Sequence, residues 1–161
     1  MASSIRIRSA VGGEVQSRGL IDTNVLVRLA ALDAAHLPGE MVISAVTLAE
    51  LSAGPHHTED SAERARRMSV LQHAEATFEP LPFDTEAART FGLVSAAVVA
   101  AGRKTRRRIA DLMIVSIAVA NQLPLYTTNP SDFTGLDDLA TVVGVPPAVM
   151  ASGSGGGAAV T

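Results

Sequence analysis

Short apolar runs alternate with longer helix-like segments along most of this chain, and that order constrains the fold more than any other feature. The apolar runs are "GLI", "MVISAV", "LPLYTTN" and "LATVVGV", and their length is typical of buried strands. Segments with helical periodicity separate them. Strands that alternate with helices in this way indicate a parallel sheet covered on both faces. We therefore expect an α/β fold, a three-layer α/β/α sandwich with a mostly parallel central sheet.

The expected helices can be placed from their periodicity and their end signals. They cover residues 24–35, 45–54, 58–75, 85–102 and 109–123. Ser44 is a plausible N-cap for the second helix, and Thr58 or Asp60 for the third. The segment "TFEPLPF" contains two prolines, so it is expected to be an edge strand or a connector.

The ends of the chain differ in composition from its middle. Residues 1–18 are expected to form a flexible leader, residues 19–148 one folded domain, and residues 149–161 a disordered Gly-rich and Ser-rich tail. The first residues contain no apolar run of signal-peptide length, and no apolar stretch reaches the roughly 18 residues that a membrane span needs. The chain has no cysteine. We expect a soluble, cytoplasmic protein that does not associate with a membrane.

Four acidic residues fall where the predicted strands end. Asp22 follows the first strand, Glu50 lies on the helix entered from the second, Asp111 begins the last long helix, and Asp132 follows the "LPLYTT" strand. Each has an ordinary structural explanation as a helix cap, a first-turn acid or a turn residue. Together they are assigned to one edge of one sheet, where ligands of such sheets bind. Clustered carboxylates need a cation, and a hard ion such as Mg²⁺ or Mn²⁺ suits oxygen ligands.

A basic run lies directly before the helix that carries Asp111. It reads "GRKTRRR" and contains Arg103, Lys104, Arg106, Arg107 and Arg108, although the net charge of the chain is −3. Such a run is often only a solvated surface. Next to a metal site, it is also suited to hold a phosphate backbone, so we expect these five residues to bind nucleic acid. Metal-bound carboxylates beside a basic strip suggest phosphodiester hydrolysis.

These residues lead to a known family. "LIDTNVL", "SAVTLAEL", "IADLMIVSIAVANQLPLYTTNPSDF" and the final "VVGV" together resemble the PIN domain, and most of all the VapC toxins of bacterial type II toxin–antitoxin systems. The resemblance covers about residues 19–145. The chain departs from the family in two places. One is the 18-residue leader, since family members usually start almost directly with the first strand, and the other is the Gly-rich tail.

The resemblance implies an endoribonuclease that depends on Mg²⁺ or Mn²⁺, is commonly a homodimer, and is held inactive by a VapB-type antitoxin. By position, Asp22, Glu50 and Asp111 match the three core metal-site acids of the family, and Asp132 matches the fourth, more variable one. The polar residues that flank the family's site are matched by Thr23, Asn24, Thr128 and Asn129.

Two other functions remain open at this stage. A phosphatase of the haloacid dehalogenase type also places an Asp after its first strand, but it needs a second acid two positions later, where this chain has Asn24. Its downstream lysine is poorly matched by Lys104, the single lysine of the chain. A partner-binding module without catalytic activity is the other alternative. No GxGxxG motif follows a strand and no P-loop motif is present, which excludes the common nucleotide-binding classes.

Overall fold

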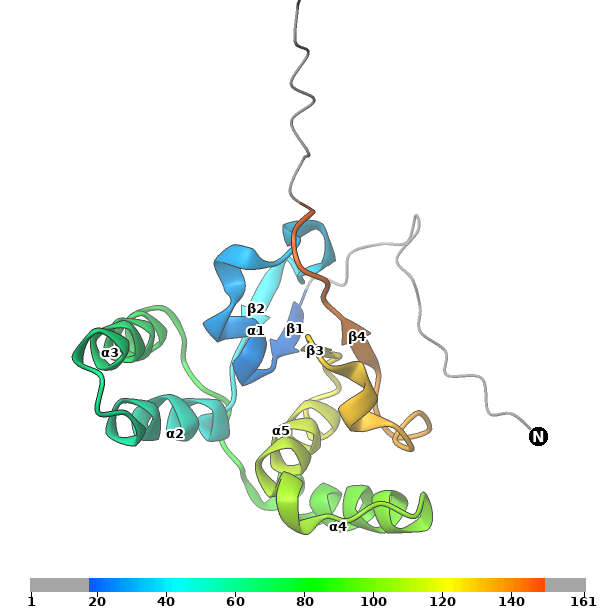
Figure 1. Cartoon of the computed structure of the whole chain (residues 1–161). Helices are drawn as coiled ribbons and strands as arrows, with labels where there is room; N and C mark the ends of the chain where they lie inside the picture. The colour runs from blue at the N-terminus through cyan, green and yellow to red at the C-terminus, as the bar shows by residue number, and fades with distance from the viewer. Residues whose placement is uncertain (1–17, 150–161) are drawn as a thin grey trace, which may run out of the picture.

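A four-stranded parallel sheet forms the centre of the molecule (Figure 1). The computed structural model describes residues 18–149, so the predicted leader up to residue 17 and the tail from residue 150 lie outside the described residues. The strands are β1 (Arg18–Ile21), β2 (Glu40–Val42), β3 (Leu125–Thr127) and β4 (Val142–Gly144), in the order β2-β1-β3-β4. Every neighbouring pair is parallel. The predicted α/β fold is confirmed.

Five α-helices and five short 3₁₀ helices are found among residues 18–149. The α-helices are α1 (Thr23–Val27), α2 (Ala45–Ala53), α3 (Ser61–Thr77), α4 (Thr85–Ala100) and α5 (Ile109–Ala120). The 3₁₀ helices are η1 (Leu29–Ala31), η2 (Ala34–His36), η3 (Gly54–His57), η4 (Arg106–Arg108) and η5 (Pro130–Phe133). Side chains of Ser44 and Asp60 cap α2 and α3, as their sequence positions predict. The proline-containing segment before α4 is a connector that touches Ser44 through a single bridge at Leu81.

The two faces of the sheet are covered by different helices, which gives three layers. Successive strand residues point to opposite faces. Leu20 and Leu125 therefore pack with residues of α4 and α5, such as Val94 and Leu112. The next residue of each strand faces the other way, and Ile21 and Tyr126 pack with α1, α2 and α3. Figure 1 shows α2 and α3 on one side of the strands and α4 and α5 on another.

One predicted helix is wrong. The periodicity of residues 24–35 indicates a continuous helix, but α1 ends at Val27 and two short 3₁₀ helices follow. Leu32 has an extended backbone and forms a bridge with Pro147 near the end of the described chain. The backbone N–H of Ala148 donates to the carbonyl of Ala31. Contacts with a distant segment thus replace the hydrogen bonds that a continuous helix needs.

The second strand is also shorter than its sequence indicates. The apolar run "MVISAV" covers residues 41–46, but β2 ends at Val42. The side chain of Ser44 accepts a hydrogen bond from the backbone N–H of Thr47 at 2.9 Å, so the helix α2 begins inside the apolar run. This early start directs α2 and its Glu50 over the end of the sheet. No helix within residues 18–149 has the length and apolar character needed to span a membrane.

Candidate metal and nuclease site

The carboxyl ends of the parallel strands bring three of the four predicted acids to one edge of the sheet. Asp22 follows β1 directly, Glu50 lies on α2 after β2, and Asp132 lies in η5 after β3. Asp111 joins them from the first turn of α5. Because strands β2, β1 and β3 are neighbours and parallel, the segments that follow them emerge side by side.

Asp22 is the most enclosed of these acids, with 5% of its surface exposed. Its Oδ1 accepts a hydrogen bond from the backbone N–H of Thr23 at 2.8 Å, so the residue caps α1. Its Oδ2 accepts a second hydrogen bond, 3.0 Å long, from the hydroxyl of Thr127 at the end of β3. The two roles considered from the sequence are therefore compatible, because capping uses one oxygen and fixes the direction of the other.

Glu50 is oriented by a row of hydroxyl groups. Thr23 Oγ1 donates to Glu50 Oε2 and lies 3.2 Å from Thr47 Oγ1. Thr47 Oγ1 in turn accepts from the hydroxyl of Ser44 at 3.1 Å. Ser44 and Thr47 are fully buried, whereas Glu50 is exposed at the surface. Each hydroxyl has one proton to donate, so Ser44 can donate to Thr47, Thr47 to Thr23, and Thr23 to Glu50. This leaves the second carboxylate oxygen of Glu50 available.

The charges of these acids act on one another. Burial raises the pKa of the Asp22 carboxyl more than its hydrogen bonds from Thr127 and Thr23 lower it, and the negative charges of Glu50 and Asp132 raise this pKa further. Burial also raises the pKa of Asp111, with added repulsion from Asp22 and Asp132 and a smaller opposing effect of Arg108. Like charges held this close favour either protonation or a bound cation.

The donor set suits a hard divalent cation. All four side chains offer carboxylate oxygens, the ligand type that Mg²⁺ and Mn²⁺ prefer. Within residues 18–149, no three acidic or imidazole side chains are arranged closely enough to hold a metal ion together. Mg²⁺ commonly binds only one or two carboxylates and keeps water and substrate phosphates as its other ligands, so it does not require three of these acids.

The basic run divides into two groups. Arg103 and Arg108 extend towards η5 and hydrogen-bond to its backbone, and Arg108 also pairs with the Asp132 carboxylate at 2.9 Å. Lys104 and Arg106 are exposed. Arg107 lies in η4, and its side chain falls outside the described part of the structure. The expected binding of nucleic acid by this run remains a prediction.

The flanking polar residues are placed unevenly around the acids. Thr23 contacts Glu50, as described above, whereas Asn24 is exposed on α1. On the β3 side, the residue that reaches Asp22 is Thr127 and not the predicted Thr128. Thr127 also accepts from the backbone N–H of Asn129 through its hydroxyl at 3.1 Å. The sequence "TTN" offers two adjacent threonines, and only the position at which β3 ends decides which of them faces the site.

A pocket elsewhere on the molecule does not compete with this site. It has a volume of about 280 Å³ and lies at the opposite edge of the sheet, where residues 122–124 lead into β3 and residues 139–141 lead into β4. Its lining contains no titratable side chain. Among the acids, in contrast, Glu50 is exposed, Asp111 and Asp132 are partly exposed, and Asp22 is buried behind them.

Comparison with known proteins identifies the family. The family model of the PIN domain matches residues 19–139. Ribonuclease VapC5 of Mycobacterium tuberculosis is 35% identical over 127 residues, which cover 77% of this chain and 91% of that protein. Ribonuclease VapC4 of the same organism is 32% identical over 128 residues, which cover 78% of this chain and 95% of that protein.

A solved structure agrees with these sequence matches. The crystal structure of VapBC-5, a member of the VapBC family of toxin–antitoxin systems from Mycobacterium tuberculosis, superposes with a TM-score of 0.71 and 34% sequence identity. The match covers 80% of this chain and 98% of that one. The parallel sheet, the helices on both its faces and the matched residues 19–139 lead to one conclusion: this chain belongs to the PIN domain family.

Proposed function

We propose that this protein is an endoribonuclease that depends on Mg²⁺ or Mn²⁺ and acts as the toxin of a toxin–antitoxin pair. One observation carries the proposal. Asp22, Glu50, Asp111 and Asp132 come from four separate segments to the carboxyl end of one sheet. There the charges of Glu50 and Asp132 raise the pKa of Asp22, and those of Asp22 and Asp132 raise the pKa of Asp111. The similarity to ribonucleases VapC5 and VapC4 supports RNA as the substrate.

The side chains of this chain prepare the site in distinct ways. When bound, a divalent ion supplies activation of water and stabilisation of charge on the attacking and leaving oxygens. Asp22 and Asp111 would hold that ion, and Glu50 and Asp132 would complete its surroundings. Thr127 orients the carboxylate of Asp22, and Thr23 that of Glu50. In this mechanism water is the nucleophile that attacks the scissile phosphate, so no side chain needs to serve as one.

The RNA backbone is held by the exposed part of the basic run. Lys104 and Arg106 are exposed close in sequence to Asp111, and Arg107 lies between them and α5. Cationic side chains beside a hydrolytic site contribute affinity that does not depend on base sequence and falls with salt. Their position lets them bind phosphates next to the scissile bond.

The proposed partner is a VapB-type antitoxin, and the proposed assembly is a homodimer. The partner is supported by the toxin–antitoxin system to which the similar VapBC-5 structure belongs. The haloacid dehalogenase alternative has no support, because the PIN domain match covers the same residues on which that alternative relied.

A cleavage assay with matched variants tests the enzymatic proposal. Purified protein is incubated with total bacterial RNA in Mg²⁺, in Mn²⁺ and in EDTA. Asp111→Asn and Glu50→Gln are expected to lower the cleavage rate by about 100-fold or more, since even partners outside the ligand shell are worth 10–100-fold. The control Glu75→Gln changes another exposed helical glutamate, on α3, and is expected to retain full activity.

The outcomes separate the remaining alternatives. Circular dichroism of each variant shows whether the fold is intact. Undiminished cleavage in EDTA, or by the Asp111→Asn protein, contradicts the mechanism. Absence of both cleavage and calorimetric Mn²⁺ binding in the unaltered protein supports the partner-binding module instead.

A further inference from the structure

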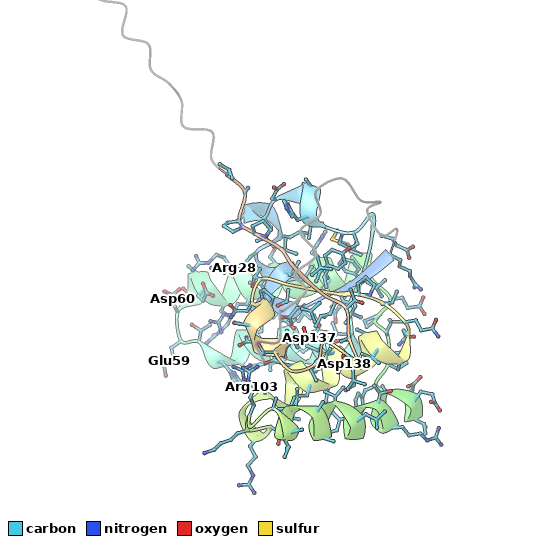
Figure 2. The ribbon with its side chains drawn as sticks, turned by 90° about the vertical axis from the view of Figure 1, so that its right-hand side faces the viewer. Arg28, Glu59, Asp60, Arg103, Asp137 and Asp138 are labelled. Atoms are coloured by element: carbon cyan, nitrogen blue, oxygen red, sulfur yellow. The ribbon has the colours of Figure 1, made fainter. Side chains whose placement is uncertain are left out.

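Arg103 is bound to the backbone of the turn that carries the fourth acid. Its Nη1 atom donates to the carbonyl oxygens of Ser131 at 3.1 Å, Asp132 at 3.3 Å and Thr134 at 3.3 Å. Ser131 and Asp132 lie within η5, and Thr134 is the residue that follows it. Figure 2 shows Arg103 beside this gold-coloured segment, at the connection between α4 and α5. The side chain therefore closes the end of the turn and reaches no carboxylate there.

Arg108 holds the same turn from the other side of the basic run. Its Nη1 atom donates to the carbonyl of Asp132 at 2.8 Å, and its Nη2 atom lies 2.9 Å from Asp132 Oδ1. The exposed fraction of the side chain is 31% for Arg108 and 29% for Asp132. One guanidinium thus fixes both the backbone and the carboxylate of Asp132, a geometry that the planar fork of donors in arginine allows.

These contacts answer a structural need of η5. The last carbonyls of a short helix have no partner within the helix and must be satisfied by other groups. Here Thr134 donates to the carbonyl of Ser131, and the two arginines supply further donors from positions that are 24 to 31 residues distant along the chain. The turn is also held by the buried Phe133 and by packing of Pro130 near Gly144 of β4, but neither contact reaches Asp132 itself.

We propose that Arg103 and Arg108 are positioning residues that hold Asp132 in the acid cluster, and that contact with RNA phosphates falls to their exposed neighbour Arg106. The inference rests on the proposed function of the cluster as a metal site and assigns separate tasks to two parts of one basic run. Arg103 is the better residue to test, because it touches only carbonyl oxygens. Its replacement loosens the turn and leaves the Arg108–Asp132 ion pair in place.

The first measurement is calorimetric binding of Mn²⁺ to the full chain without RNA. Arg103→Gln is expected to weaken binding about 3–10-fold, which is at or below the range for partners that orient a metal ligand. Arg103→Lys keeps one charged donor, and its Mn²⁺ affinity is expected to lie between those of Arg103→Gln and the unaltered protein. Arg106→Gln removes the same charge at an exposed position and is expected to bind Mn²⁺ normally.

The second measurement is binding of a 2′-O-methyl RNA oligonucleotide in EDTA, which reports phosphate contacts without cleavage. Arg106→Gln is expected to weaken binding and reduce the salt dependence by about one phosphate contact. Arg103→Gln is expected to bind the oligonucleotide as the unaltered protein does. The opposite pattern, with normal Mn²⁺ affinity and weaker RNA binding for Arg103→Gln, overturns the proposal.

A double-mutant cycle with Asp132→Asn shows whether Arg103 acts through Asp132. If it does, Arg103→Gln causes no further loss of Mn²⁺ affinity once Asp132 has been replaced. Additive losses contradict the proposal. If Arg103→Gln does not fold, the same cycle is run with Arg103→Lys. If the unaltered protein does not bind Mn²⁺, the proposed metal site is rejected. If the unaltered protein binds Mn²⁺ and both Arg103 variants bind it equally well, only the role of Arg103 is rejected.

Discussion

Asp22 combines a structural and a chemical role in one carboxylate. One oxygen caps α1, and the other is held by Thr127 from a strand that lies 105 residues later in the chain. A lone Asp between a strand and a helix is explained by capping alone. What the cap cannot explain is a pKa raised by burial and by the charges of two other acids. Carboxylates with a pKa shifted by burial and by neighbouring charges are common at functional sites.

The raised pKa of Asp22 predicts how stability changes with pH in the metal-free protein. The folded protein holds the proton more tightly than the unfolded chain, so the stabilisation from this group is present at low pH and is lost as pH rises above 3.8 through the folded pKa. Asp22→Asn removes the charge. In EDTA, the free energy of unfolding of this variant, relative to the unaltered protein, is therefore expected to increase between pH 4 and pH 8.

Urea unfolding at a series of pH values measures this difference. Saturating Mn²⁺ at pH 7 is expected to reverse its sign, because the ion stabilises only the protein with an intact site. If the difference in the free energy of unfolding stays constant with pH in EDTA, the pKa of Asp22 is not raised by its surroundings.

At the scale of elements, close packing between β1 and β3 depends on a residue without a side chain. A Cβ at Gly19 would lie 2.3 Å from Cε2 and 2.7 Å from Cδ2 of Tyr126, a residue that is 5% exposed. Gly19→Ala is expected to lower the free energy of unfolding by about 1–3 kcal/mol, the usual cost of overpacking a core. Thermal unfolding measures the change.

The matched control is Gly92→Ala in α4. A Cβ at Gly92 meets nothing within 4 Å, so this substitution is expected to stabilise the protein by about 0.5–1 kcal/mol through helix propensity. Equal effects of the two substitutions would contradict the role given to Tyr126.

Elements with strong local signals could be predicted from the sequence, and those that depend on distant contacts could not. The helices α3, α4 and α5 follow from their length, periodicity and, for α3, its cap Asp60. The helix expected over residues 24–35 fails because Leu32 pairs with Pro147, a contact that no local pattern contains. The same limit applies to the site. The four acids could be grouped through strand order, but neither Thr127 nor the contacts of Arg103 could be found without the register of β3 and the path of η5.

At the scale of the whole molecule, the last described residues tie the fold together. After β4, the backbone N–H of Val145 donates to Thr127, and the N–H of Asp33 donates to Pro146. This segment, residues 145–148, joins the connection between β1 and β2 to the strand that holds Asp22 in place. Val145 is also 3% exposed, and so contributes to the core.

Two truncated chains test the contribution of residues 145–148. A chain that ends after Val149 keeps the segment, and a chain that ends after Gly144 lacks it. The shorter chain is expected to lose about 2–4 kcal/mol of stability, from one buried valine and three backbone hydrogen bonds. Chemical denaturation of the two chains measures the difference, and equal midpoints would show that the segment is not needed.

The order of the acids along the chain has a consequence for synthesis. Asp22 is translated early, whereas Asp132 and the hydroxyl of Thr127 that holds Asp22 come from the last quarter of the chain. A nascent polypeptide on the ribosome thus contains single carboxylates but no assembled site until that final portion has emerged and added β3 to the sheet. For a protein proposed to cut cellular RNA, this topology delays activity until the segment from β3 to η5 has been translated.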